Sequence, residues 1–377
     1  MSAPHEEEIQ EIRQAVRRFA AAELAPNAAR WDREKVFPKD ALQGLAAMGL
    51  YGVAIAEEWG GAGLDYTSLA VACEEIAAGD CSTATIVAVN NLVAGILAGY
   101  GNDAQKTRFL KPLAQGKMLG AFALTEPHVG SDASAITTRA ERKGSDYVLN
   151  GVKQFITSGK NADVAVVFAV TDKGAGKKGI SAFLVPTSTP GYVVARIEDK
   201  TGQRASDTAQ IVLENCKTEH LLGGEGGGYR IALANLESGR INVAAQATGV
   251  ARAALEAATA YARERKSMGK HLIEHQAVNF RLADMATQVE AARQLYLHAA
   301  RLRDAGEPCL KEASMAKLFA SEMAEHVCSD AIQIHGGYGY VSDFPVERLW
   351  RDVRVTKIYE GANDIQRLVI GRALEEG

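Results

Sequence analysis

One carboxylate near the C-terminus stands where it could act as a base. Glu360 lies between Tyr359 and Gly361, just before a segment that we expect to be helical. Asn363 is a good N-cap for that helix, and Ile365, Leu368, Val369 and Leu374 follow at roughly helical spacing. A carboxylate on a tight turn ahead of a helix can point into a cleft, where apolar neighbours would raise its pKa. The alternative is a solvated loop glutamate, which is the usual meaning of an isolated Glu-Gly pair.

Further motifs upstream favour the first interpretation. In chain order they are residues 121–132 (AFALTEPHVGSD), 150–159 (NGVKQFITSG), 265–270 (RKSMGK), 275–276 (HQ) and 333–340 (QIHGGYGY). Together with the segment around Glu360, they resemble the acyl-CoA dehydrogenase family over essentially the whole chain. Each motif alone is only moderately specific, but their order and separations together are highly specific.

Composition indicates an ordinary soluble protein that does not bind nucleic acid. Of its 377 residues, 47% are hydrophobic and 23% charged, with a formal net charge of −4 and no long basic run. No cysteine pair has the spacing of a metal site, so we expect no metal and interpret the cysteines as buried thiols of a reducing compartment. They are Cys73, Cys81, Cys216, Cys309 and Cys328.

Neither a targeting signal nor a membrane span is expected. The N-terminal residues 1–8 (MSAPHEEE) are acidic and lack an apolar core. The apolar stretch from Thr83 to Tyr100 is interrupted by Asn90 and Asn91, which favours a buried helix over a membrane span. We therefore expect a cytoplasmic protein with no membrane association.

The predicted fold is α+β and multidomain. Helical patterns fill an N-terminal all-α domain, residues 1–118, in which Ile9, Ile12, Val16, Phe19 and Leu24 share one face. Short β-rich runs without intervening helices indicate a middle antiparallel β domain, residues 119–223. Long Ala- and Leu-rich runs indicate a C-terminal helix bundle, residues 224–377, and the resemblance implies that it is a four-helix bundle. The glycine-rich run 223–228 does not have the spacing of a dinucleotide-binding loop and is interpreted as a hinge before a helix.

The resemblance implies an FAD enzyme that removes hydrogen from the α and β carbons of an acyl-CoA thioester. The β C–H bond is unactivated, so a flavin must lie against it as a two-electron acceptor. Residues 122–131 resemble the flavin-binding segment of the family. The resemblance implies that Leu124 and Thr125 lie near the ring edge and Ser131 near the pyrophosphate, and that Phe122 and Gly130 also bind the cofactor.

A second segment, Phe155, Ile156 and Thr157, matches the part of the family that faces the flavin ring. Phe155 stands where the family often has a tryptophan, which keeps stacking but removes an indole N–H. Thr157 stands where a hydroxyl reaches the reactive side of the ring. Taken alone, each would be an ordinary core aromatic or strand threonine.

The resemblance also implies that a neighbouring subunit supplies part of the adenine end of the site. Arg265 and Ser267 resemble the residues that meet the cofactor's phosphates and adenosine, and Gln333, Gly336 and Gly337 resemble a glycine turn close to the pyrophosphate. His275 and Gln276 match a further pair that contacts the flavin. Outside this context the arginine would be a solvated helix charge and the histidine a core residue. Ala362 replaces a threonine that is common in relatives, and Asp364 stands where Gln or Glu is frequent. A short acid near phosphates would be unfavourable unless it faces away.

Glu360 corresponds to the catalytic base of the short- and medium-chain members. The thioester carbonyl would accept hydrogen bonds from the Glu360 backbone N–H and from a ribityl hydroxyl of the flavin. Other branches place the base on another helix, at the position that is Gly239 here, and Glu237 is a distant second candidate. The residues implied along the substrate path are Ser131, Glu237, Arg240, Tyr359 and Gly361; for Glu237 and Arg240, a helix-start ion pair is the alternative.

Two stretches bear on the acyl chain. Residues 89–92 (VNNL) resemble the pocket helix of short-chain members, and residues 308–319 resemble short-branched-chain relatives. We expect a straight or branched acyl group of four or five carbons, an electron-transferring flavoprotein as acceptor, and a homotetramer built as two dimers. The alternatives are an acyl-CoA oxidase that uses oxygen and a catalytically silent flavoprotein of the same fold.

Overall fold

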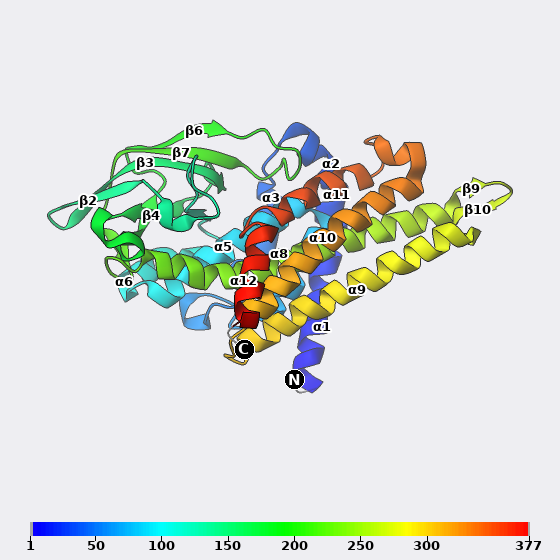
Figure 1. The fold of residues 1–377 in the computed structure, drawn as a ribbon, viewed down its shortest axis with the longest axis horizontal. Coiled ribbons are helices and arrows are strands. Elements are labelled where there is room, and N and C mark those ends of the chain that lie inside the picture. Colours follow the sequence, from blue (N-terminus) through cyan, green and yellow to red (C-terminus); the bar gives the residue numbers. More distant parts are fainter. Residues whose placement is uncertain (1–2, 376–377) are drawn as a thin grey trace.

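The computed structural model describes residues 3–375, and Met1 and Ser2 of the acidic N-terminal stretch lie outside this range. The first part of the chain is helical (Figure 1). Its helices are α1 (Ala3–Phe19), α2 (Ala25–Glu34), α3 (Lys39–Ala47), α4 (Tyr66–Gly79), α5 (Cys81–Tyr100), α6 (Asp103–Gln105) and α7 (Lys111–Ala114), with π-helical turns at Ala20–Leu24 and Lys106–Leu110.

The predicted apolar face of the first helix is confirmed, because Ile9, Val16 and Leu24 are buried. Helix α5 is the one helix within residues 3–375 that is long and apolar enough to cross a membrane, yet most of it is buried inside the protein. Its two asparagines bond to neighbouring loops: Asn90 Nδ2 donates to Tyr51 O (3.0 Å) and Asn91 Nδ2 to Leu50 O (2.8 Å). The interruption in the apolar run thus fixes a core helix in place.

The middle of the chain forms an eight-stranded sheet. Its strands are β1 (Gly120–Ala123), β2 (Arg139–Lys143), β3 (Asp146–Thr157), β4 (Val164–Val170), β5 (Ile180–Pro186), β6 (Tyr192–Ile197), β7 (Thr208–Thr218) and β8 (His220–Leu222). The order is β6-β7-β3-β2-β4-β5-β8, with β1 beside β4. Most neighbours are antiparallel, as predicted, but β1 pairs with β4 in parallel, and β2 meets β4 in one parallel pair. The long intervening segment 124–163 makes the parallel crossover of β1 possible.

The last part of the chain is helical again. Its helices are α8 (Gly228–Glu264), α9 (Gln276–Asp304), α10 (Leu310–His335), α11 (Val346–Val353) and α12 (Asn363–Glu375), with a short hairpin of β9 (Lys266–Ser267) and β10 (Lys270–His271). Helices α8, α9 and α10 pack against one another and α12 packs on α10. Figure 1 places the β9–β10 hairpin at the opposite end of these long helices from the sheet. The glycine-rich run 223–228 leads directly into α8, as predicted.

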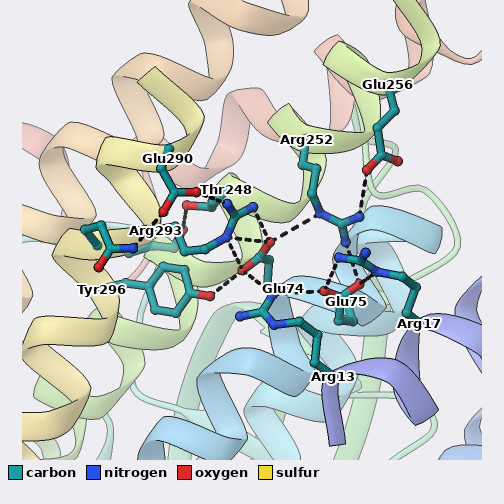
Figure 2. A network of polar contacts seen from close by, with 12 residues as sticks. Arg13, Arg17, Glu74, Glu75, Thr248, Arg252, Glu256, Glu290, Arg293 and Tyr296 are labelled. Atoms are coloured by element: carbon teal, nitrogen blue, oxygen red, sulfur yellow. Dashed lines mark hydrogen bonds and ion pairs between the residues drawn. The ribbon is translucent and has the colours of Figure 1, made fainter. Parts of the chain in front are cut away.

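A buried network of ion pairs joins the two helical parts (Figure 2). Glu74 and Glu75 of α4 are almost fully buried. They pair with arginines from three other helices: Arg13 of α1, Arg252 of α8 and Arg293 of α9. Because removing one member leaves buried charges without partners, the network ties these helices together.

Candidate active site

Glu360 lies on a strained turn between a 3₁₀ segment (Arg354–Lys357) and helix α12. Its φ is +54° and that of Gly361 is +86°. The left-handed region costs a residue with a side chain about 1–2 kcal/mol. Gln366 stabilises the turn, because its Nε2 donates to Glu360 O (3.2 Å) and Gly361 O (2.8 Å).

The Glu360 carboxylate lies against helix α8 at Gly239. A Cβ atom at position 239 would come within 2.5 Å of Glu360 Oε2 and 2.9 Å of its Cδ. Among residues 3–375, no group donates a hydrogen bond to the buried Oε2 atom. Burial raises the pKa of Glu360 to about 7, although the positive charges of Arg240 and Lys317 oppose the rise. The side chain is therefore an acceptor that can be ionised near neutral pH.

Lys317 and Asn363, which sequence analysis did not assign to the site, support this turn. Lys317 of α10 is fully buried, and its Nζ donates to Gly361 O (2.9 Å) and Asn363 Oδ1 (2.8 Å). Asn363 was predicted as the N-cap of the last helix, but the helix begins at Asn363 and Ala362 O accepts the first helical bonds. The Asn363 side chain is occupied by Lys317 and Ser321 instead. A lysine in an Ala-rich helical pattern gives no sequence signal that it is buried.

The second candidate base is already paired. Glu237 Oε1 accepts from Arg303 Nη1 (2.8 Å) and from Cys309 Sγ (3.3 Å). Arg240, by contrast, is buried near Glu360, and its Nη1 donates to Ser314 Oγ at 3.4 Å. Of the two carboxylates, only that of Glu360 has a buried oxygen that receives no hydrogen bond from the described part of the chain, residues 3–375.

Tyr359 is anchored inside the protein through its hydroxyl group. The hydroxyl donates to Gln246 of α8 and accepts from Gln203 Nε2 (3.4 Å), which lies in the loop between β6 and β7. These bonds fix the residue directly before Glu360 to two other parts of the chain.

The two segments predicted to face a flavin are adjacent. Gln154 N donates to Thr125 O at 2.8 Å, which joins the loop after β1 to strand β3. Lys153, fully buried, donates to Leu124 O (3.1 Å) and pairs with Glu126 (2.9 Å).

Phe155 projects out of the sheet. Strand β3 changes register against β7 between Lys153 and Ile156, and Phe155 has a φ of +59° there. Such a bulge re-aims a side chain, and the Phe155 ring is 62% exposed while Ile156 is buried. Thr157 ends the strand opposite Thr208. Backbone strain is often found at ligand-binding sites, so this exposed ring is a candidate binding surface.

The other residues near β1 that were predicted to bind flavin differ in burial. Phe122 packs edge-on against Phe168 with ring centroids 5.1 Å apart. Gly130 and Ser131 are exposed in the loop that follows. The loop itself is closed by paired backbone bonds between Glu126 and Val129.

The residues assigned to the adenine end gather at the other end of the bundle. His275 Nε2 bonds to Ser267 O (3.0 Å), Gln276 begins α9, and the Arg265 guanidinium lies 5.8 Å from the Tyr338 ring centroid. Gln333 is on the last turn of α10, and Gly336 (φ +61°) and Gly337 follow it, exposed, with open space where a Cβ would stand. Figure 1 shows the β9–β10 hairpin at this end of the helices, far from the sheet, and Phe155 belongs to strand β3 of that sheet. One chain therefore does not bring the two groups together.

Ala362 and Asp364 flank the start of α12. Ala362 is partly buried and Asp364 is almost fully exposed, with its carboxylate 3.6 Å from Arg367. Asp364 thus has its charge in solvent, the arrangement in which a short acid is tolerated near phosphates.

Comparison with known proteins identifies the family. Residues 6–117, 121–216 and 226–375 match the N-terminal, middle and C-terminal domains of acyl-CoA dehydrogenase, respectively. The chain belongs to the acyl-CoA dehydrogenase family. The predicted family and fold class are both confirmed, and the protein is an oxidoreductase of this family.

Relatives of this acyl-CoA dehydrogenase family member align along nearly its whole length. The mitochondrial short-chain specific acyl-CoA dehydrogenase of Rattus norvegicus is 47% identical over 96% of this chain and 88% of its own. Butyryl-CoA dehydrogenase from Megasphaera elsdenii has a TM-score of 0.96 at 40% identity, covering 100% of this chain and 99% of its own. A chain in a structure of the electron transferring flavoprotein of Acidaminococcus fermentans has a TM-score of 0.97 at 45% identity, covering 98% of both chains. A glutaryl-CoA dehydrogenase from Mycobacterium smegmatis, solved in complex with FADH2, has a TM-score of 0.92 at 32% identity, covering 100% of this chain and 96% of its own.

Proposed function

We propose that this protein catalyses the FAD-dependent α,β-dehydrogenation of a short-chain acyl-CoA, with Glu360 as the base that removes the α-proton. The observation that carries the proposal is the Glu360 carboxylate, whose buried Oε2 lies over Gly239 and has no donor within residues 3–375. A base of this kind needs a free lone pair aimed into a protected space.

The electrostatics of Glu360 suit proton abstraction near neutral pH. An ordinary glutamate is a weak base, but burial raises the pKa of Glu360 to about 7. A pKa close to the working pH combines a useful ionised fraction with proton affinity. The nearby positive charges of Arg240 and Lys317 keep the ionised form accessible despite burial.

The backbone of the same turn supports binding of the thioester. Among residues 3–375, the Glu360 N–H has no acceptor. An N–H group beside the base can donate to the thioester carbonyl and stabilise the negative charge that grows on its oxygen as the α-proton leaves.

The residues of the sheet face fit FAD. The exposed Phe155 ring offers a flat apolar surface beside Leu124 and Thr125, and Ser158 Oγ is buried there without a partner among residues 3–375. When bound, FAD supplies the acceptor for the hydride that leaves the β-carbon. Leu124, Thr125, Phe155 and Thr157 would hold its ring portion.

A second copy of the chain would complete the cofactor site. The β9–β10 hairpin, which includes Ser267, lies far from the sheet that carries Phe155 (Figure 1), so the two serve the same cofactor only if another subunit brings the hairpin end to the sheet. Exposed apolar side chains near them, including Met268 at 94% and Tyr340 at 87% exposure, suit burial in such an interface. Because two identical faces are exchanged, a symmetric dimer results, and two dimers give the proposed tetramer.

A short acyl chain and an electron-transferring flavoprotein acceptor complete the proposal. The short-chain substrate is supported by about 40% or greater identity to proteins named for short-chain and butyryl substrates. The acceptor is supported by the occurrence of a chain of this fold in the structure of an electron transferring flavoprotein.

The experiment that tests the base is Glu360→Gln, with Glu237→Gln as the matched control. Glu360→Gln should keep bound flavin and bind butyryl-CoA but lose about 10²–10⁴-fold in turnover, the usual contribution of a general base. Glu237→Gln should retain more activity, because that carboxylate is already paired. Near wild-type turnover in Glu360→Gln would refute the assignment.

Two further measurements test the substrate and the acceptor. Flavin bleaching is followed with butyryl, isobutyryl, octanoyl and glutaryl thioesters, and the fastest reduction should occur with the short chains. Reoxidation is then compared in air with and without an electron-transferring flavoprotein. Fast reoxidation by air alone would favour an oxidase.

A further inference from the structure

Lys317 is an unusual residue to find in the middle of the C-terminal bundle. It lies on α10 and is fully buried, although lysine is almost never buried without a partner of opposite charge. Its two hydrogen-bond acceptors are both neutral: the Gly361 carbonyl at 2.9 Å and the Asn363 side-chain carbonyl at 2.8 Å. Apolar side chains would suffice to pack α10 against α12. The hydrogen bonds that the Lys317 amine makes must therefore explain why a lysine is buried here.

A comparison with Lys153 shows the difference. Lys153 is equally buried, but its Nζ pairs directly with the carboxylate of Glu126 at 2.9 Å. Lys317 has no salt bridge within residues 3–375, and the charged groups around it are Glu360, Arg240 and Glu322. Burial lowers the pKa of Lys317 to about 7, and the Glu360 charge opposes that fall.

The two acceptors of Lys317 belong to Gly361 and Asn363, which are separated by one residue at the end of the Glu360 turn. Gly361 directly follows Glu360 and has a φ of +86°, and Asn363 is the first residue of α12. Gln366 donates to the same Gly361 carbonyl at 2.8 Å, and Ser321 donates to the same Asn363 oxygen at 3.2 Å. The amine thus links α10 to two points that follow the carboxylate, the carbonyl of Gly361 and the first residue of α12.

We propose that Lys317 is a positioning residue for the reaction: by holding Gly361 and Asn363, it keeps the Glu360 carboxylate in its left-handed turn over Gly239. The inference rests on the proposed role of Glu360 as base. A left-handed glutamate is strained, so the turn relaxes unless neighbouring groups fix it. The charge of the protonated amine additionally favours the ionised base.

The test compares Lys317→Met with Lys357→Met in flavin-loaded enzyme. Both variants remove one positive charge, but Lys357 is partly exposed and pairs with Glu325 (2.7 Å), and the charges that act on Glu360 are those of Arg240 and Lys317. Lys317→Met should lower kcat/KM per bound flavin by about 10- to 100-fold, the effect of a misplacement of about 1 Å. Its acid limb in the pH profile should move to higher pH, because a cation that favours ionised Glu360 is gone. Lys357→Met should show neither change.

A structural measurement accompanies the kinetics. Backbone amides of residues 359–366 should exchange with solvent faster in Lys317→Met than in wild type, with those of α10 unchanged. If Lys317→Met does not accumulate as holoenzyme, Asn363→Ala removes one of the two acceptors and should give the same changes at smaller size.

The outcomes separate the two proposals. The role of Lys317 is overturned if Lys317→Met has the kcat/KM, the pH profile and the amide exchange of wild type. If Asn363→Ala is tested in its place, unchanged kinetics in that variant overturn the role. A kinetic loss fully explained by lost flavin or lost folded protein would also overturn it. Glu360→Gln, measured alongside, reports on the base itself: if it remains active, the proposed base is wrong regardless of Lys317.

Discussion

Replacement of Gly239 by alanine should impair catalysis without weakening the fold. The added Cβ would stand 2.5 Å from Glu360 Oε2, whereas carbon atoms in contact ordinarily approach to about 3.5 Å. The carboxylate must therefore retreat by about 1 Å, and a misplacement of this size costs about 10²-fold in rate. Expressed as a barrier, that is about 2.7 kcal/mol.

The free energy of unfolding of Gly239→Ala should rise, although its catalytic rate falls. Gly239 is inside α8 with ordinary helical φ, and alanine is favoured over glycine in a helix interior by about 0.5–1 kcal/mol. The atoms that must give way are the end of the Glu360 side chain rather than backbone, so the fold can absorb the change.

The assay is steady-state kcat/KM with butyryl-CoA per bound flavin, together with thermal unfolding. Gly99→Ala on α5 is the control, because nothing lies within 4 Å of its added Cβ. It should leave kcat/KM unchanged. Wild-type kcat/KM in Gly239→Ala would refute the reasoning, since it would mean that the carboxylate does not work from its position over Gly239.

Three other predictions follow from separate parts of the structure. The kcat/KM for butyryl-CoA should fall about tenfold per pH unit below a pKa of about 7, because protonated Glu360 cannot accept a proton; a plateau persisting to well below pH 6 would contradict this. Phe155→Ala should lower flavin content, read from visible absorbance, while thermal unfolding of the flavin-free protein stays the same, because the ring is 62% exposed and packs little against its own chain. Glu74→Gln should lower the free energy of unfolding by about 3–5 kcal/mol in denaturant titrations, because Arg13, Arg252 and Arg293 lose a buried partner. Since pairing lowers the pKa of Glu74 to about 2, its stabilisation is present above the unfolded pKa of about 4.5 and lost as pH falls towards 2, so the variant should also show a weaker acid transition.

Periodicity predicted the helical and β-rich parts of the chain because hydrophobic spacing directly reports which face is buried. The face shared by Ile9, Val16 and Leu24 and the buried helix interrupted by Asn90 were both visible in this way. The parallel pairing of β1 with β4 was not, since strand direction depends on how a distant segment returns to the sheet. The role of Asn363 was mistaken for a similar reason, because its competing partner, Lys317, is 46 residues away in the sequence.

The motifs predicted which residues belong to the candidate site, but the backbone conformation determines where their side chains point. Neither the positive φ of Glu360 nor that of Phe155 follows from local sequence, because non-glycine residues enter this region only when tertiary contacts hold them there. Lys317 escaped notice because a lysine in a helical pattern normally marks a solvent-facing position.

The contact between Glu360 and Gly239 explains why the two possible positions for the base exclude each other. Sequence resemblance placed alternative bases at these two positions, and the fold brings the carboxylate of one within 2.5 Å of where the other would carry a Cβ. A side chain at 239 would occupy the volume that the Glu360 carboxylate needs, and two carboxylates there would repel each other in a poorly solvated space. A side chain at position 239 would therefore displace the Glu360 carboxylate from the place that it has in this structure. The same reasoning makes Gly239 a constraint on function rather than on folding, since α8 itself would be more stable with alanine.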